Sequence, residues 1–118
     1  MLNLNHKSLN VWKLAMDLVT KIYKITAGFP KEEMYGIISQ IRRASISVPS
    51  NVAEGAARSS AKERKRFFEI SRSSLVEIDT QLEIALKLNF CSEDGLFEIA
   101  EQMNYLFASL SKLITKTN

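Results

Sequence analysis

The stretch from Gln40 to Arg58 is the feature that most restricts what this chain can fold into. It reads QIRRASISVPSNVAEGAAR. Drawn as a helix, at about 100° per residue, it separates into a polar stripe and an apolar stripe. The polar stripe contains Gln40, Arg43, Ser47, Asn51, Glu54 and Arg58. The apolar stripe beside it contains Ile37, Ile41, Ala44, Val48 and Val52. This pattern predicts a helix that packs against others along one side.

The polar stripe carries short amides, hydroxyls and opposite charges, which favours a half-buried structural network over a freely solvated face. Glu54 could be paired with Arg43 or with Arg58 of the same stripe, and Arg58, four residues further on, is its direct helix neighbour. A carboxylate beside arginines has a lowered pKa and makes a poor general acid or base. We therefore interpret the pair as a buried ion pair that fixes register, not as a catalytic group.

Pro49 lies inside this predicted helix and allows two interpretations. The helix either kinks at Pro49 and continues, or stops near Ser47 and restarts with the proline in a first turn. Because both stripes keep their phase across Pro49, we favour one kinked helix over residues 31–57. Gly55 lies on the core side of this helix, where it favours close approach of a neighbouring backbone.

The segment at residues 42–55, RRASISVPSNVAEG, resembles the signature of the small bacterial four-helix-bundle proteins encoded in intervening sequences of the large ribosomal RNA. The preceding segment VWKLAMDLVTKIYKIT and the Phe29–Pro30 turn are also similar to that family. The one departure is Val52, where the family has Ile. The resemblance covers nearly the whole chain and implies a four-helix bundle.

That family is also similar to the accessory variability determinant of diversity-generating retroelements. This relative is a pentameric ring of four-helix bundles that binds nucleic acid and a reverse transcriptase. The resemblance therefore implies a homopentamer whose partners are RNA or DNA, with a partner protein such as a reverse transcriptase.

The remaining pattern predicts a single all-α domain over residues 1–118, an antiparallel up-down four-helix bundle. Only four glycines and two prolines occur, which suits a few long helices. The helices are expected at residues 9–27, 31–57, 61–89 and 93–116. Ser8, Ser60 and Ser92 are the expected N-caps, and Ser60 forms a capping box with Glu63.

The apolar residues exceed what one core needs. The first helix is apolar over more than half its circumference, whereas a core-facing helix needs a stripe of about 100°. The predicted core face of the third helix is Phe67, Ser71, Ser74, Leu75, Ile78, Leu82 and Ala85. Ile70, Val76 and Ile84 lie outside it. We therefore expect a closed homo-oligomer, a dimer by default and a pentamer by resemblance.

Charge is unevenly distributed along the chain, whose net charge is +3. Residues 42–72 carry +5, and residues 73–111 carry −6. The candidate nucleic-acid-binding residues are Arg58, Lys62, Lys65, Arg66 and Arg72. No aromatic residue interleaves with them, so contacts are expected with phosphates and not with stacked bases. Two alternatives remain. These residues form only a solvated basic face, or the protein is a scaffold that binds a partner enzyme.

Little in the sequence points to catalysis. His6 is the only histidine and Cys91 the only cysteine, so no metal set, disulfide or catalytic constellation can be assembled. No glycine-rich phosphate loop occurs. We expect a protein that is not an enzyme and needs no cofactor. The absence of a signal peptide or an apolar run of about 20 residues predicts a cytoplasmic location without membrane contact.

Overall fold

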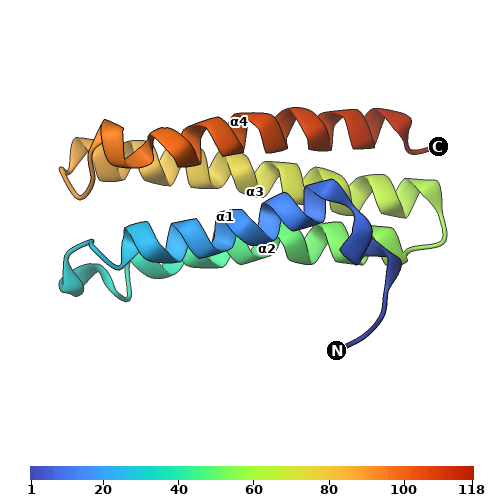
Figure 1. Cartoon of the computed structure of the whole chain (residues 1–118), viewed down its shortest axis with the longest axis horizontal. Helices are drawn as coiled ribbons and strands as arrows, with labels where there is room; N and C mark the ends of the chain where they lie inside the picture. The colour runs from blue at the N-terminus through green and yellow to red at the C-terminus, as the bar shows by residue number, and fades with distance from the viewer.

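The computed structural model describes all 118 residues and contains four long α-helices and no β-strand (Figure 1). The helices are α1 (Asn10–Thr26), α2 (Ile37–Ala57), α3 (Ala61–Lys87) and α4 (Glu93–Lys116). Two short 3₁₀ turns, η1 (Asn5–Ser8) and η2 (Lys31–Glu33), precede α1 and α2. The prediction of an all-α chain with four long helices is confirmed.

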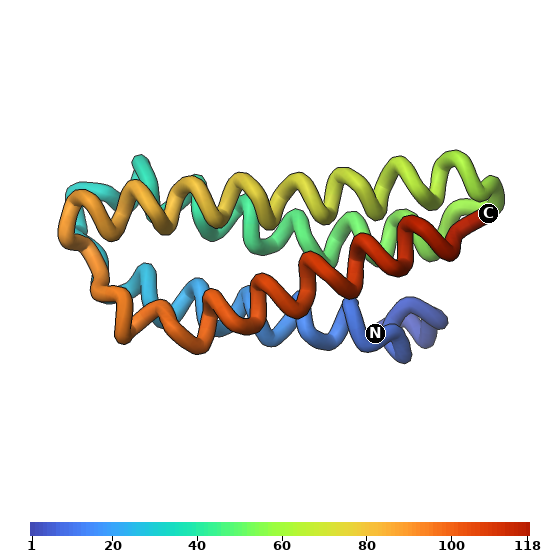
Figure 2. Tube along the Cα trace, turned by 90° about the horizontal axis from the view of Figure 1, so that it is seen from above, coloured from blue at the N-terminus to red at the C-terminus, as the bar shows by residue number.

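Each helix lies against its neighbours in the chain, and α1 also lies against α4. Figures 1 and 2 show the connecting turns at alternate ends of an elongated body. The body measures 43 × 28 × 20 Å. The α2–α3 turn lies at the same end as the C-terminus, and the α1–α2 and α3–α4 turns lie at the other end (Figure 1).

Two of the three predicted helix caps are present. The Ser60 hydroxyl accepts a hydrogen bond from the Glu63 backbone N–H at 3.1 Å, and Ser92 accepts one from Gly95 at 3.1 Å. The prediction for Ser8 is wrong, because Ser8 lies in η1 and its hydroxyl donates to the Asn5 carbonyl at 2.8 Å. The residue before α1 is Leu9, which has no side chain able to cap a helix.

The predicted start of α2 is also wrong, by six residues. Residues 31–33 form only a 3₁₀ turn, and Gly36 adopts φ −113° and ψ −118°, which is not helical. From Ile37 onward α2 runs through Pro49 without interruption, as the continuous alternative predicted. α3 ends at Lys87 and not at residue 89, since Asn89 has a left-handed φ of 60° that no α-helix continues.

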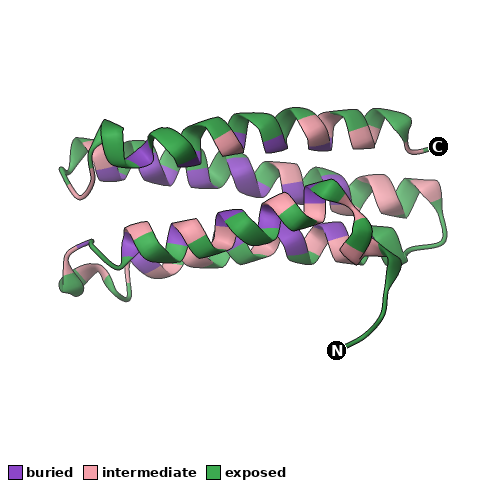
Figure 3. Cartoon of the chain, viewed as in Figure 1, coloured by how far each residue is buried: buried purple, intermediate pink, exposed green.

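The core runs along the inner faces of all four helices (Figure 3). Four of the five predicted apolar residues of α2 are buried, and Ile37 packs against the core from its edge. On α3 the prediction of Phe67 is wrong: the buried ring is Phe68, only 3% exposed. Phe67 instead lies half-buried under the Arg58 guanidinium, whose carbon is 4.8 Å from the ring centre.

Candidate nucleic-acid interface

The two ends of the bundle differ in charge, although the end with the acidic residues also holds Lys24, Lys31 and Lys87. The α2–α3 turn brings Arg58, Lys62 and Arg66 to one end. At the other end, the two turns and the start of α4 carry four carboxylates that belong to Glu32, Glu33, Glu93 and Asp94. Because the connecting turns lie at alternate ends, the basic turn and the acidic turns are placed at different ends of the long axis of the molecule.

Three of the five candidate basic residues are free to meet a ligand. Lys62 and Arg66 are exposed and Lys65 is half-buried, all in the first two turns of α3. None of the three belongs to an ion pair. Their positive charge is therefore not neutralised by a neighbouring carboxylate of this chain.

The other two candidates are held by neighbouring side chains. Arg58 donates to the Glu54 carboxylate at 3.0 Å and covers Phe67. Arg72 donates to the Ser111 hydroxyl of α4 at 3.0 Å and lies 5.7 Å from the centre of the Phe107 ring. Arg58 is thus held beside Glu54 of α2 and Arg72 beside Ser111 of α4, so these two arginines are less free than the other three candidates to contact a ligand.

The same end of the bundle holds two further lysines that the sequence pattern did not indicate. Arg64 donates to the Ser59 carbonyl at 2.8 Å and to the Asn118 carbonyl at 3.4 Å, so it joins the α2–α3 turn to the end of α4. Lys112 and Lys116 are exposed in the last turns of α4, close to this junction. Only the folded topology brings them toward Lys62. We call this region, Arg58, Lys62, Lys65, Arg66, Lys112 and Lys116, the basic end.

The middle of the polar stripe forms a small network between α2 and α3. The Ser47 and Ser74 hydroxyls are 2.8 Å apart, and Asn51 donates to the Ser47 hydroxyl at 2.9 Å. Next to it, the buried Ser71 donates to the Val48 carbonyl at 2.8 Å, beside Pro49. The Ser47–Ser74 and Ser71–Val48 bonds join the two helices where the proline has removed one helical donor.

The ends of the stripe are different from what its spacing predicted. Gln40 and Arg43 are exposed. Glu54 pairs with Arg58 and not with Arg43, and the Glu54 and Arg58 side chains are 56% and 42% exposed. The expectation of a buried ion pair is therefore wrong: in the last turn of α2, Gly55 packs against Phe68 of α3, and the Glu54–Arg58 pair is left exposed to solvent.

A polar cluster between α1 and α4 was not anticipated from the sequence. Lys21 of α1 lies 2.8 Å from Glu98, 3.0 Å from Asp17 and 2.7 Å from the Gln102 side-chain oxygen. The hydrogen bond to Glu98 is the main cause of a raised pKa at Lys21. The hydrogen bond from Lys21 is the main cause of a lowered pKa at Asp17. The only sequence signal was the Asp17–Lys21 spacing of four, which gives no information about α4.

The remaining reactive side chains are isolated. No three His, Cys, Asp or Glu side chains are grouped as a metal site would require. Burial raises the pKa of the Cys91 thiol, which favours its protonated form. His6 packs edge-on against Trp12, with ring centres 5.2 Å apart. None of the four helices combines the length and apolar content needed to cross a membrane.

Comparison with curated proteins finds no match to this chain. Comparison with protein families matches residues 7–113 to the family described as 23S rRNA-intervening sequence protein. The match includes all of α1, α2 and α3 and most of α4. The chain therefore belongs to the 23S rRNA-intervening sequence protein family.

Proposed function

We propose that this antiparallel, up-down bundle is the subunit of a closed, non-enzymatic homo-oligomer that binds nucleic acid through the basic end. The observation that carries the proposal is the unpaired charge of Lys62, Lys65 and Arg66. Cations that are not neutralised within the protein are available to replace the counterions of a phosphate backbone. The family description connects the chain with ribosomal RNA sequences, which makes RNA the first ligand to test.

Exposed apolar side chains support self-association. Ile84 is 45% exposed and Ile70 38% exposed, and both lie on α3 outside its buried face. Met16 and Tyr23 are exposed on α1. Closed point-group assemblies are the usual way to bury such surface. The similarity to the retroelement accessory protein favours a pentamer, and a ring would repeat the basic end once in each subunit and add weak contacts together.

The expected binding mode is contact with phosphates and little sequence preference. Phe67 lies beneath Arg58, and its face is therefore not free for base stacking. Binding should weaken linearly with the logarithm of salt concentration, because counterions are released from the nucleic acid.

The test is a titration of fluorescently labelled RNA and DNA duplexes at several salt concentrations. Replacing Lys62, Lys65 and Arg66 together with Ala should lower the salt slope by about 0.7–0.9 for each lost phosphate contact. The matched control replaces Lys24, Lys31 and Lys87 with Ala. These three are also exposed and unpaired, but they lie at the opposite end of the bundle.

The control removes the same net charge, so it separates local contact from a general electrostatic effect. If both triple variants lose the same slope, the basic end is not the binding site. If neither loses any, and both remain folded with the wild-type mass in light scattering, the protein-scaffold function becomes the better explanation. A monomeric mass at micromolar concentration would contradict the oligomer.

A further inference from the structure

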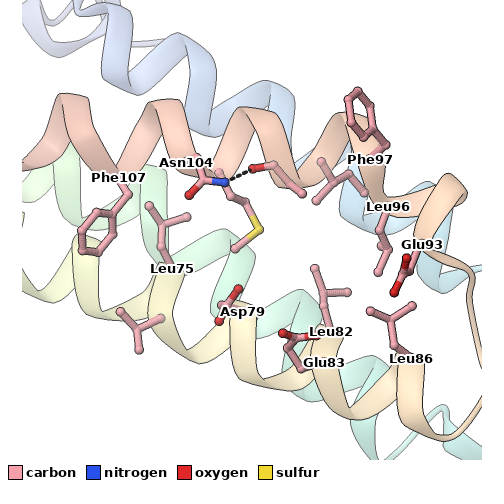
Figure 4. Close-up of a pocket in the computed structure, with 14 residues that line it drawn as sticks. Leu75, Asp79, Leu82, Glu83, Leu86, Glu93, Leu96, Phe97, Asn104 and Phe107 are labelled. Carbon is pink, nitrogen blue, oxygen red and sulfur yellow. Dashed lines mark hydrogen bonds between the residues drawn. The ribbon is translucent and has the colours of Figure 1, made fainter.

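A groove of about 540 Å³ lies between α3 and α4, away from the basic end. Ten of its fourteen lining residues are hydrophobic. Figure 4 shows Leu82 and Leu86 of α3 extending toward Leu96 of α4 across the space between the two helices. The groove is therefore an apolar channel that the chain leaves open along its own core.

The margins of the groove are acidic. Asp79 and Glu83 project from α3, and Glu93 projects from the start of α4 (Figure 4). None of the three carboxylates forms an ion pair, and no Lys or Arg lines the groove. An anionic ligand such as a nucleic acid would be repelled there. A ligand with an apolar stripe flanked by cationic side chains would place the stripe on the apolar floor and the cations beside the carboxylates.

We propose that this groove binds an amphipathic helix of a partner protein that carries Lys or Arg along both sides of an apolar stripe. An antiparallel helix pair with an apolar floor is the standard geometry for helix-in-groove recognition. The α3 lining runs from Leu75 to Leu86, which corresponds to about 16 Å at 1.5 Å per residue. That length accommodates roughly three turns of a docked helix, with apolar anchors at positions i, i+4, i+7 and i+11.

This inference does not depend on nucleic-acid binding, because the groove and the basic end carry opposite charge and belong to different parts of the surface. It gives the molecule two separate docking regions. One is suited to phosphates, and the other is suited to a basic helix.

The probe is a fluorescein-labelled 18-residue peptide with Leu at i, i+4, i+7 and i+11, Lys on both flanks and Ala or Gln elsewhere. Binding is measured by fluorescence anisotropy with the full-length protein. A second peptide has Glu in place of every Lys, and a third has the same composition as the first with the Leu residues dispersed. We expect the first peptide to bind at least about tenfold more tightly than either of the others.

Two matched pairs of variants locate the site. Ala100→Trp fills the groove, whereas Ala108→Trp changes another exposed alanine of α4 that does not line it. Glu83→Gln removes a marginal charge, whereas Glu101→Gln removes an exposed charge of α4 that does not line the groove. Ala100→Trp should weaken binding by at least about tenfold and Glu83→Gln by about threefold, while both controls stay within about twofold of wild type.

Circular dichroism shows whether each variant is folded, and light scattering shows whether the mass of its assembly has changed. Lack of binding by the Lys peptide up to about 1 mM, or equal binding of the Lys and Glu peptides, overturns the proposal. Equal effects of Ala100→Trp and Ala108→Trp on variants that remain folded also overturn it. If Ala100→Trp lowers the mass of the assembly, the groove is filled by a second copy of this chain, and the partner helix is excluded.

Discussion

Gly55 of α2 lies directly against the ring of Phe68 on α3. A methyl group built on Gly55 would be 2.7 Å from the Phe68 Cε1 atom and 3.1 Å from the Arg64 carbonyl oxygen. The Phe68 side chain is 3% exposed and cannot swing out into solvent. The glycine therefore permits close approach of the two helices just before the turn that connects them.

Gly55→Ala should destabilise the protein in spite of its better helix propensity. Overpacking costs about 1–3 kcal/mol, whereas the change from Gly to Ala inside a helix favours folding by up to about 1 kcal/mol. Urea unfolding should therefore give a net loss of about 1–2 kcal/mol. The matched control is Gly28→Ala, whose added methyl group would meet only the Ile25 carbonyl oxygen at an ordinary 3.5 Å. Equal stability of the two variants would contradict this account of Gly55.

Glu54→Ala should cost little. The Glu54–Arg58 pair is solvent-exposed, and exposed pairs contribute about 0.2–1 kcal/mol. Thermal unfolding in low and in high salt is the appropriate measurement, because salt should remove most of the small difference from wild type. A loss of 3 kcal/mol or more, on the scale of about 3–5 kcal/mol for a broken buried pair, would show that Glu54 is buried in the assembled protein.

Ser71→Ala should cost more than Glu54→Ala, although it removes only one oxygen atom. The Ser71 hydroxyl is fully buried and donates to the Val48 carbonyl. Removal of a buried hydrogen bond costs about 0.5–1.5 kcal/mol, and no water can replace the lost donor. Ser73→Ala provides the control, since Ser73 is exposed on the same helix. The order of the denaturation midpoints of these variants tests the prediction.

The same substitution should have opposite effects at two glutamines. The side-chain oxygen of Gln81 is buried without a hydrogen-bond partner, so Gln81→Met should raise Tm by removing an unsatisfied polar atom. Gln102 donates to the Leu14 carbonyl at 3.0 Å and accepts from Lys21 at 2.7 Å. Gln102→Met should therefore lower Tm. A decrease at both positions would indicate that Gln81 has a partner in the assembled protein.

The Asp17–Lys21–Glu98 cluster should make stability depend on pH at both extremes. The folded-state pKa of Asp17 is below its ordinary 3.8, so its contribution is present above that value and is lost as the pH falls through the folded pKa. The folded-state pKa of Lys21 is above its ordinary 10.5, so its contribution is present below that value and is lost as the pH rises through the folded pKa.

Asp17→Asn measures the acidic side of this dependence. The difference in Tm between wild type and Asp17→Asn should be constant from pH 5 to pH 8 and should shrink below about pH 4. Because Asp17 is largely solvent-exposed, the difference should be small and reduced by salt. A difference that grows on acidification would contradict the lowered pKa.

The sequence predicted best those features that depend on a few neighbouring residues. The caps at Ser60 and Ser92 need only a hydroxyl and a backbone N–H three residues later, and both were correct. The start of α2 was wrong because Glu32 and Glu33 also suit a helical first turn. The backbone of Gly36 separates them from the helix, and composition does not reveal its φ and ψ.

Features that depend on contacts between two different helices were harder to predict from the sequence. Phe67 and Phe68 are adjacent and equally apolar, and the choice between them depends on the space that Gly55 leaves on another helix. Likewise, charge counts along the chain gave the basic turn but not Lys112, because its proximity comes from the folding of α4 back to that end. The exposure of Glu54 is a similar case, since periodicity gives the face of a helix on which a residue lies but not how far another helix covers it.

The open groove between α3 and α4 also affects the order in which the helices of the bundle unfold. Gly55 against Phe68 and the serine bonds at Val48 and Ser74 join α2 to α3, whereas the groove separates α4 from much of α3 and a single side-chain hydrogen bond, from Arg72 to Ser111, joins the two. α4 should therefore detach as a separate cooperative unit before the α2–α3 pair opens. In native-state hydrogen exchange, the amides of α4 should exchange through a partial opening that needs less free energy than global unfolding. Those of α2 around Val48 and Val52 should exchange only when the whole chain unfolds.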